Sequence, residues 1–175
     1  MTLPFEGTTP RLADDVFVAP GALLIGDVTA GEGASFWYNV VVRGDVCPIR
    51  VGARTNVQDL SVIHVTSGKF STDIGDDVTI GHRAIIHGCR IEAGCLIGMG
   101  AIVMDGAVVG KSSIVGAGAV VTPGTVIPPR SLVVGSPAKV RREVRDDEIP
   151  GLYASALHYV ALAERHRVSL QGRTT

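Results

Sequence analysis

Three histidines in the middle of the chain have a spacing that could bring them onto one metal ion. His82 and His87 stand five residues apart in the segment IGHRAIIHGCR, and His64 precedes them in the segment VIHV. Imidazole is the commonest protein ligand for a transition metal, and three imidazoles around one open position form a catalytic zinc arrangement. Whether these side chains can meet depends on the fold that carries them.

Aliphatic residues recur at intervals of six along most of the chain. The ladder comprises Val18, Leu24, Ala30, Phe36, Val42, Val51, Val57, Ile63, Ile74, Ile80, Ile86, Ile91, Ile97, Val103, Val109, Val115, Val121, Ile127 and Val133. Glycine or another small residue often follows, as in Ile97-Gly98 and Val109-Gly110. This hexapeptide pattern predicts a parallel β-helix with the aliphatic residues in a narrow core, because an amphipathic helix would need a period of about 3.6.

The composition fits one soluble domain and argues against several classes of partner. The 175 residues are 46% hydrophobic and include 22 glycines, which is enough for a single buried core. The formal net charge is -1 and no long run of Lys or Arg occurs, so neither nucleic acid nor an anionic membrane is expected as the main partner. Because no targeting segment or membrane-spanning stretch is recognisable, we expect a cytoplasmic protein.

The cysteines fit the same interpretation. Cys47, Cys89 and Cys95 are odd in number and form no CxxC pair, which argues against a disulfide framework. We interpret them as small, reduced core residues.

Two long steps in the ladder mark irregular coils. Val42 and Val51 are nine residues apart, which predicts a widened turn at RGDVCP. Ile63 and Ile74 are eleven apart, which predicts that VTSGKFST projects from a corner as a loop.

The ladder ends near residue 136, so we assign residues 1–136 to the β-helix and 137–175 to a C-terminal helical segment. After Pro150, a set of apolar residues recurs at helical spacing: Leu152, Ala156, Tyr159, Val160 and Ala163. We expect this helix to pack along the outside of the solenoid, within a single domain.

If three hexads form one triangular coil, residues three ladder steps apart stack about 4.8 Å apart on neighbouring coils. Ile63 and Ile86 are three steps apart, so His64 and His87, which follow them directly, should lie one above the other. The same count places Arg43 one coil below His64.

His82 falls on a different side of the triangle, where Asp59 should lie one coil below it and Gln58 one coil below Gly81. A single chain would therefore struggle to bring His82 to the other two histidines. A homotrimer could do so, with His64 and His87 from one subunit and His82 from its neighbour at each of three equivalent sites.

These residues resemble the γ-class carbonic anhydrase family. The resemblance extends from about Pro10 to the final helix and rests on these motifs: Arg43-Gly44-Asp45, Thr55-Asn56-Val57-Gln58-Asp59, Val62-Ile63-His64, Gly81-His82, Ile86-His87-Gly88-Cys89 and Ile97-Gly98-Met99-Gly100-Ala101.

The resemblance implies a left-handed β-helix, an exception to the right-handed crossover rule, assembled as a homotrimer with zinc, or iron or cobalt, between subunits. It implies that His64, His82 and His87 are the ligands, and that Gln58 orients the metal-bound hydroxide. It also implies that Arg43 and Asp59 pair across the interface. The remaining candidate catalytic residues from the same motifs are Asp45 and Asn56.

The expected activity is reversible hydration of carbon dioxide to bicarbonate. A zinc ion lowers the pKa of bound water to about 7, which supplies hydroxide at neutral pH. The chain departs from the archetypal member of the family, which has a glutamate after its equivalent of Asp45 and a second in a long acidic loop. Here Val46 and the short loop VTSGKFST carry no carboxylate for proton transfer.

Two other classes of function stay open. Hexapeptide acyltransferases use the same β-helix with an acyl-CoA donor and one histidine as general base, and the segment Gly135-Ser136-Pro137-Ala138-Lys139 resembles the end of their repeat region. The alternative is a noncatalytic metal-binding or assembly protein, or a thioesterase-like enzyme. Only the site can separate these, because the fold is common to all of them.

Overall fold

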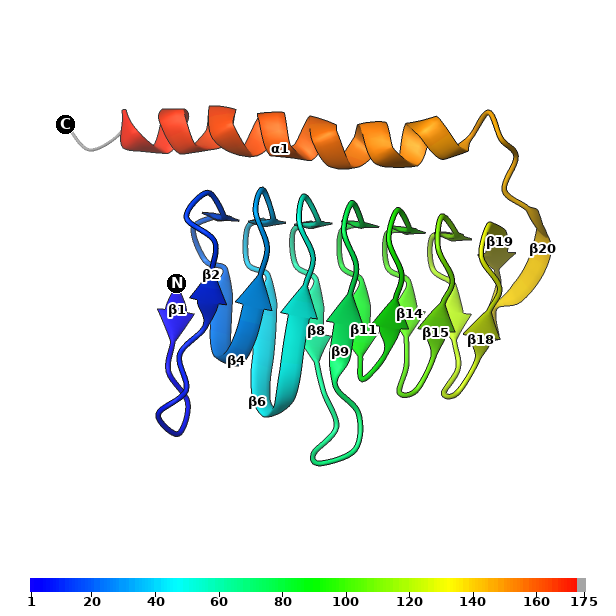
Figure 1. Cartoon of the computed structure of the whole chain (residues 1–175), viewed down its shortest axis with the longest axis horizontal. Helices are drawn as coiled ribbons and strands as arrows, with labels where there is room; N and C mark the ends of the chain where they lie inside the picture. Colours follow the sequence, from blue (N-terminus) through cyan, green and yellow to red (C-terminus); the bar gives the residue numbers. More distant parts are fainter. Residues whose placement is uncertain (173–175) are drawn as a thin grey trace.

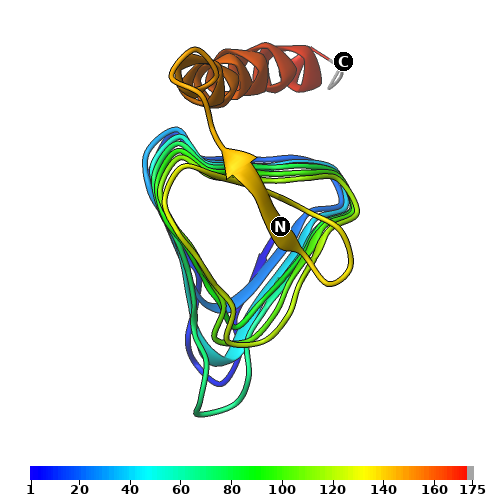
Figure 2. The same cartoon turned by 90° about the vertical axis from the view of Figure 1, so that its right-hand side faces the viewer.

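The computed structural model describes residues 1–172. The chain winds into a parallel β-solenoid that matches the left-handed β-helix of hexapeptide repeats, with one helix beside it (Figure 1). Seen along its axis, the solenoid has a triangular section (Figure 2). The predicted fold class is thus confirmed.

We name the three sides of the triangle the histidine face, the second face and the helix face. The histidine face contains β1 (Thr2–Leu3), β8 (Val62–His64), β11 (Ile85–His87), β14 (Ile102–Val103) and β17 (Val120–Val121). The second face contains β2 (Arg11–Leu12), β9 (Thr72–Ile74), β12 (Arg90–Ile91), β15 (Val108–Val109) and β18 (Val126–Ile127). Two long strands, β4 (Leu23–Ala30) and β6 (Val41–Val51), bend from one of these faces to the other.

The helix face is a separate sheet of short strands. It contains β3 (Phe17–Val18), β5 (Ser35–Phe36), β7 (Asn56–Val57), β10 (Thr79–Ile80), β13 (Leu96–Ile97), β16 (Ile114–Val115), β19 (Ser131–Val134) and β20 (Lys139–Glu143). The helix α1 (Ile149–Gln171) lies across the outside of this sheet and contacts β3, β5, β7 and β10.

The aliphatic ladder forms the core as its spacing predicts. Val42, Ile63, Ile86 and Val103 are fully buried and aligned, since Val42 pairs with Ile63, Ile63 with Ile86 and Ile86 with Val103. Each coil buries its aliphatic residue against the same residue of the next coil, so the period of the sequence fixes the register of the whole solenoid.

The two irregular coils differ from one another. VTSGKFST forms the expected loop between β8 and β9, closed by an antiparallel bridge between Thr66 and Phe70. RGDVCP, expected as a widened turn, is instead part of the continuous strand β6, which bends around the corner while it stays extended. The parallel strand β4 bends beside it and pairs with both halves of β6, which keeps these residues in a sheet.

The C-terminal segment contains both a strand and the expected helix. Its first part is β20, which pairs antiparallel to β19 and ends the helix face. Pro150 lies in the first turn of α1, and Leu152, Ala156 and Ala163 are buried beneath the helix as its spacing predicts. Residues 173–175 of the predicted segment lie outside the described residues. Within the described part of the chain, no helix is long and apolar enough to cross a membrane.

Candidate metal centre

His64 and His87 lie directly over one another on the histidine face. They are paired residues of β8 and β11, and His64 Nδ1 lies 3.1 Å from His87 Nε2. Two nitrogens bound to one tetrahedral zinc, each at 2.0–2.1 Å, are about 3.3 Å apart. The stacking inferred from the six-residue ladder is therefore confirmed, and the separation fits two ligands of a single ion.

A carboxylate holds the other nitrogen of each of these rings. His64 Nε2 lies 3.0 Å from Asp45 Oδ1, and His87 Nδ1 lies 2.7 Å from Asp105 Oδ1. In metalloproteins, such carboxylates fix the tautomer and orientation of ligating histidines. The two contacts leave His64 Nδ1 and His87 Nε2, the pair that faces each other, free to bind a metal.

Arg43 sits beside Asp45 and forms an ion pair with it. Burial would raise the pKa of Asp45, but hydrogen bonds from His64 and Arg43 outweigh this effect and hold the pKa below its usual value. Asp45 is therefore ionised at neutral pH and can accept the hydrogen bond from His64. The expected pairing of Arg43 with Asp59 concerns two chains and stays a prediction.

Asp105 is a functional candidate that the sequence did not reveal. It follows β14, one coil beyond His87, and its second oxygen accepts a hydrogen bond of 3.0 Å from Thr66 Oγ1 in the projecting loop. Counting coils could have located it. Gly106 lies one coil beyond Gly88, to whose carbonyl its backbone N–H donates, and Asp105 therefore lies next to His87. A lone aspartate in a turn does not stand out without the histidine beside it.

Replacing Asp105 tests whether this carboxylate supports a metal ligand. Asp105→Ala should weaken zinc binding by roughly 10- to 100-fold, the usual loss when the carboxylate behind a ligating histidine is removed. Competition with a chromogenic chelator measures the affinity. Asp73→Ala, which removes an aspartate from the second face, is the control and should bind zinc like the wild type. Equal affinities for both variants would exclude Asp105 from the site.

His82 occupies the corner between the helix face and the histidine face. It lies in the turn between β10 and β11. There the backbone N–H of Arg83 donates a 3.0 Å hydrogen bond to the carbonyl of Asp59, and the backbone N–H of Gly100 donates a 2.8 Å hydrogen bond to the carbonyl of His82. Asp59 and His82 therefore stack at this corner as the coil count predicts. His82 Nδ1 lies 2.8 Å from Asp59 Oδ2, and the other oxygen of Asp59 accepts a 3.1 Å hydrogen bond from the backbone of Tyr38.

The third histidine thus has the same arrangement as the other two, with one nitrogen held by a carboxylate and the other uncommitted. His82 is also accessible, since 42% of its side chain is exposed. Among residues 1–172, however, no three His, Cys, Asp or Glu side chains gather closely enough to hold one ion. A single chain brings together two of the three expected ligands.

Gln58 and Asn56 lie on the next coil below and are buried. Gln58 Nε2 donates a 3.1 Å hydrogen bond to Asn56 Oδ1. Gln58 follows the expected register, because its backbone N–H donates to the carbonyl of Ile80, and the backbone N–H of Asn56 donates in the same way to the carbonyl of Val78.

A cavity of 260 Å³ opens beside Asp45. Its wall combines Val46 and Cys47 of β6 with Phe5 and Glu6 of the N-terminal turn. Val46 carries no carboxylate, as noted from the sequence, but the fold adds Glu6 from a distant part of the chain. Asp45 is the residue that this cavity shares with the candidate metal centre.

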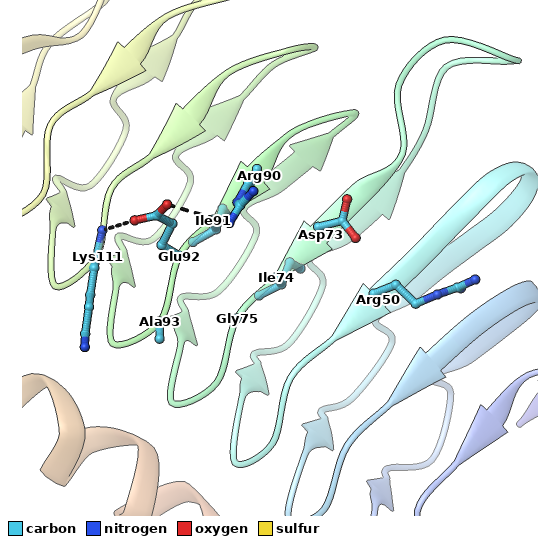
Figure 3. A pocket seen from close by; sticks show the side chains of 9 residues that line it. All are labelled: Arg50, Asp73, Ile74, Gly75, Arg90, Ile91, Glu92, Ala93 and Lys111. Atoms are coloured by element: carbon cyan, nitrogen blue, oxygen red, sulfur yellow. Dashed lines mark hydrogen bonds and ion pairs between the residues drawn. The ribbon is translucent and has the colours of Figure 1, made fainter.

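A separate cavity of 610 Å³ lies on the second face (Figure 3). Its lining carries three cationic and two anionic side chains; Glu92 pairs with Arg90 at 3.9 Å and accepts a hydrogen bond of 2.9 Å from the backbone of Lys111. Asp73 lies between Arg50 and Arg90 in register. Because none of the three histidines lines this cavity, it is distinct from the candidate metal centre.

Two of the three cysteines are core residues. Cys89 and Cys95 are buried in the core, and burial raises the pKa of each thiol to about 12. They are neutral at physiological pH, as expected of small core residues. Cys47 is a free, partly buried thiol.

The chain is similar to known proteins over most of its length. Residues 88–123 match the family model described as bacterial transferase hexapeptide (six repeats), and residues 72–103 match the hexapeptide repeat of succinyl-transferase. A probable carbonic anhydrase of Methanocaldococcus jannaschii is 52% identical over 87% of this chain and 96% of its own. The mitochondrial gamma carbonic anhydrase 2 of Arabidopsis thaliana is 48% identical over 90% of this chain. The chain belongs to the γ-class carbonic anhydrase family.

By this membership the protein is a carbonic anhydrase-like lyase. The chain spans 59% of the length of the plant γ-class carbonic anhydrase. Among solved structures, one from Bacillus cereus described as a putative acetyltransferase aligns with a TM-score of 0.93 and 39% identity, over 96% of this chain and 97% of its own. The γ-class fold is therefore shared with a protein to which another activity is attributed.

Proposed function

We propose that this protein catalyses the reversible hydration of carbon dioxide to bicarbonate, as a homotrimer with zinc between its subunits. The observation that carries the proposal is the pair of ring nitrogens of His64 and His87, 3.1 Å apart, on rings that carboxylates hold from behind. The names of the relatives support the reaction. Iron and cobalt are the alternative ions for such imidazole ligands, and a cytoplasmic location stays a prediction.

The surface around the histidines supports the trimer. Val62 and Ile85 point outward on the histidine face with 38% and 42% of their surface exposed, and Leu60 and Met99 at the His82 corner are 55% and 59% exposed. Exposed apolar side chains bordered by polar ones mark an interaction surface. Contact between this face and the corner of a second copy would cover them, and would add His82 of the partner subunit to His64 and His87.

Three histidines would then bind the metal, and three aspartates would orient them. Asp45 and Asp105 fix the tautomer and orientation of His64 and His87, so that one ring nitrogen of each faces the other, and Asp59 does the same for His82. When bound, the metal supplies a nucleophile at neutral pH by lowering the pKa of a water ligand to about 7.

Three further residues act around these ligands. Arg43 holds Asp45 ionised and, in the trimer, is available to pair with Asp59 of the partner subunit. Asn56 fixes the amide of Gln58, and that amide orients the attacking oxygen. The hydration of carbon dioxide releases one proton, which must pass to buffer because neither Val46 nor the loop VTSGKFST carries a carboxylate.

A second candidate is acyl transfer from an acyl-CoA, which the description of the Bacillus cereus structure favours. This activity needs one histidine as a general base and does not need three metal ligands. It predicts coenzyme A binding and catalysis by metal-free protein, which hydration does not.

Metal analysis and stopped-flow hydration test the proposal. Protein purified without added metal should contain about one transition-metal ion per chain in the trimer. It should hydrate carbon dioxide, lose this activity when a chelator removes the ion and recover it with zinc. Because Val46 offers no carboxylate, the rate should also rise with the concentration of an imidazole-type buffer. Metal-free protein that binds coenzyme A and transfers its acyl group, together with a zinc-loaded trimer that does not hydrate carbon dioxide, would instead establish acyl transfer.

A further inference from the structure

A chain of three side-chain hydrogen bonds connects α1 to Gln58. Thr79 Oγ1 in β10 donates to Ser155 Oγ in α1 at 3.2 Å, and Asn56 Nδ2 donates to Thr79 Oγ1 at 3.0 Å. Gln58 Nε2 then donates to Asn56 Oδ1 at 3.1 Å. These contacts begin on a helix that covers the outside of the solenoid (Figure 1) and end at a candidate catalytic residue.

The partners of Asn56 determine which way its amide faces. Asn56 Nδ2 also lies 3.5 Å from the carbonyl oxygen of Val78, and a carbonyl can only accept a hydrogen bond. Thr79 donates its only hydroxyl proton to Ser155, so toward Asn56 it can act only as an acceptor, and it accepts from the same Nδ2. Asn56 must therefore present Oδ1, its acceptor, to Gln58.

The orientation of Gln58 follows from that of Asn56. Since Asn56 presents an acceptor, Gln58 must turn its Nε2 toward it, and its Oε1 faces away from Asn56. An amide oxygen accepts hydrogen bonds and never donates them, so Gln58 Oε1 can hold the attacking oxygen only by accepting a hydrogen bond from its O–H group. In this orientation a lone pair, and not the O–H bond, is left to point at carbon dioxide.

Burial makes this arrangement rigid. Asn56 is fully buried, Thr79 is 5% exposed and Gln58 is 6% exposed, so water cannot replace a missing partner. Ser155 is held against the sheet because Leu152 and Ala156, on the same side of α1, are buried. Networks of satisfied buried hydrogen bonds fix a single arrangement.

We propose that Ser155 and Thr79 are positioning residues for Gln58. Through them α1 fixes the direction in which the Gln58 amide faces, in addition to covering the helix face. The proposal rests on the proposed hydration activity for its catalytic consequence. Its structural part concerns only the amides of Asn56 and Gln58 and is independent of that activity.

The first test uses metal-free protein and NMR of the side-chain amides. Thr79→Val removes the hydroxyl at constant volume, and Ser155→Ala removes the acceptor in α1. Both should shift the Asn56 and Gln58 amide signals and speed their hydrogen exchange. Thr79→Ser keeps the hydroxyl and should restore the wild-type signals. Ser169→Ala, at an exposed position on the same helix, is the matched control and should change neither amide.

The second test separates positioning from folding. In the metal-loaded trimer, Thr79→Val should lower kcat by about fivefold, as expected when one buried hydrogen bond is lost, with KM and metal content unchanged. Ser155→Ala should lower kcat by about twofold. Unchanged Asn56 and Gln58 signals in both variants would overturn the proposal, as would an equal loss of kcat in Thr79→Ser. If the wild type does not hydrate carbon dioxide, the proposed function fails, while the NMR comparison still decides the positioning role.

Discussion

Neither His64→Ala nor His82→Ala protein should bind zinc on its own, but a mixture of the two should recover about one quarter of the sites. Each proposed site takes His64 and His87 from one subunit and His82 of the partner subunit. In trimers reassembled from equal amounts of the two variants, a site is intact only under two conditions. The subunit that contributes the histidine pair must keep His64, and the neighbour that contributes the third ligand must keep His82. With random assembly this occurs at about one interface in four.

The measurement is metal content of the refolded mixture, compared with each variant refolded alone. His158→Ala, which alters an exposed histidine of α1, is the control and should retain full metal content. Full occupancy of an isolated wild-type monomer would disprove the shared site. A mixture that recovers no metal, although it forms trimers, would show that His64 and His82 do not belong to the same site on neighbouring chains.

Gln58→Ala should keep zinc but lose roughly 10- to 100-fold of kcat for hydration, because the ligands stay in place while the attacking oxygen loses its orientation. The buried amide donates a 3.1 Å hydrogen bond to Asn56 Oδ1, whereas the three histidines are held by Asp45, Asp105 and Asp59, so metal content should not fall. Stopped-flow kinetics and metal analysis on the same preparation measure both quantities.

The control for this change is Gln171→Ala, which replaces the other glutamine of the chain, at the end of α1. Its kcat should equal that of the wild type. Loss of zinc from Gln58→Ala would instead assign Gln58 to the integrity of the metal site. Unchanged turnover would make it a structural residue of the corner.

The sequence by itself determined the fold and the stacking of the site. In a solenoid whose coils repeat every three hexads, the distance along the chain fixes which residues are neighbours. The step from Ile63 to Ile86 was therefore enough to place His64 over His87, and the contact of their rings at 3.1 Å confirms it. The same count correctly placed Asp59 under His82.

Tertiary structure decided the contacts that the repeat does not encode. Asp105 reaches His87 from a turn, and the direction of a side chain at a corner depends on the local backbone and not on the period. Glu6 comes beside Asp45 because the N-terminal strand β1 pairs with β4, although it lies outside the aliphatic ladder. Neither position follows from counting hexads.

Helix packing is the other feature that only the three-dimensional structure could supply. The helix has a period of 3.6 residues and the coils a period of six, so the sequence predicted which residues of α1 face the solenoid but not which coil each one meets. The contact of Ser155 with Thr79 at 3.2 Å depends on how the bend through β20 sets the helix over the sheet. The sequence determined the stack of histidines, whereas the tertiary structure decided the carboxylates and hydroxyls that hold them and Gln58 in place.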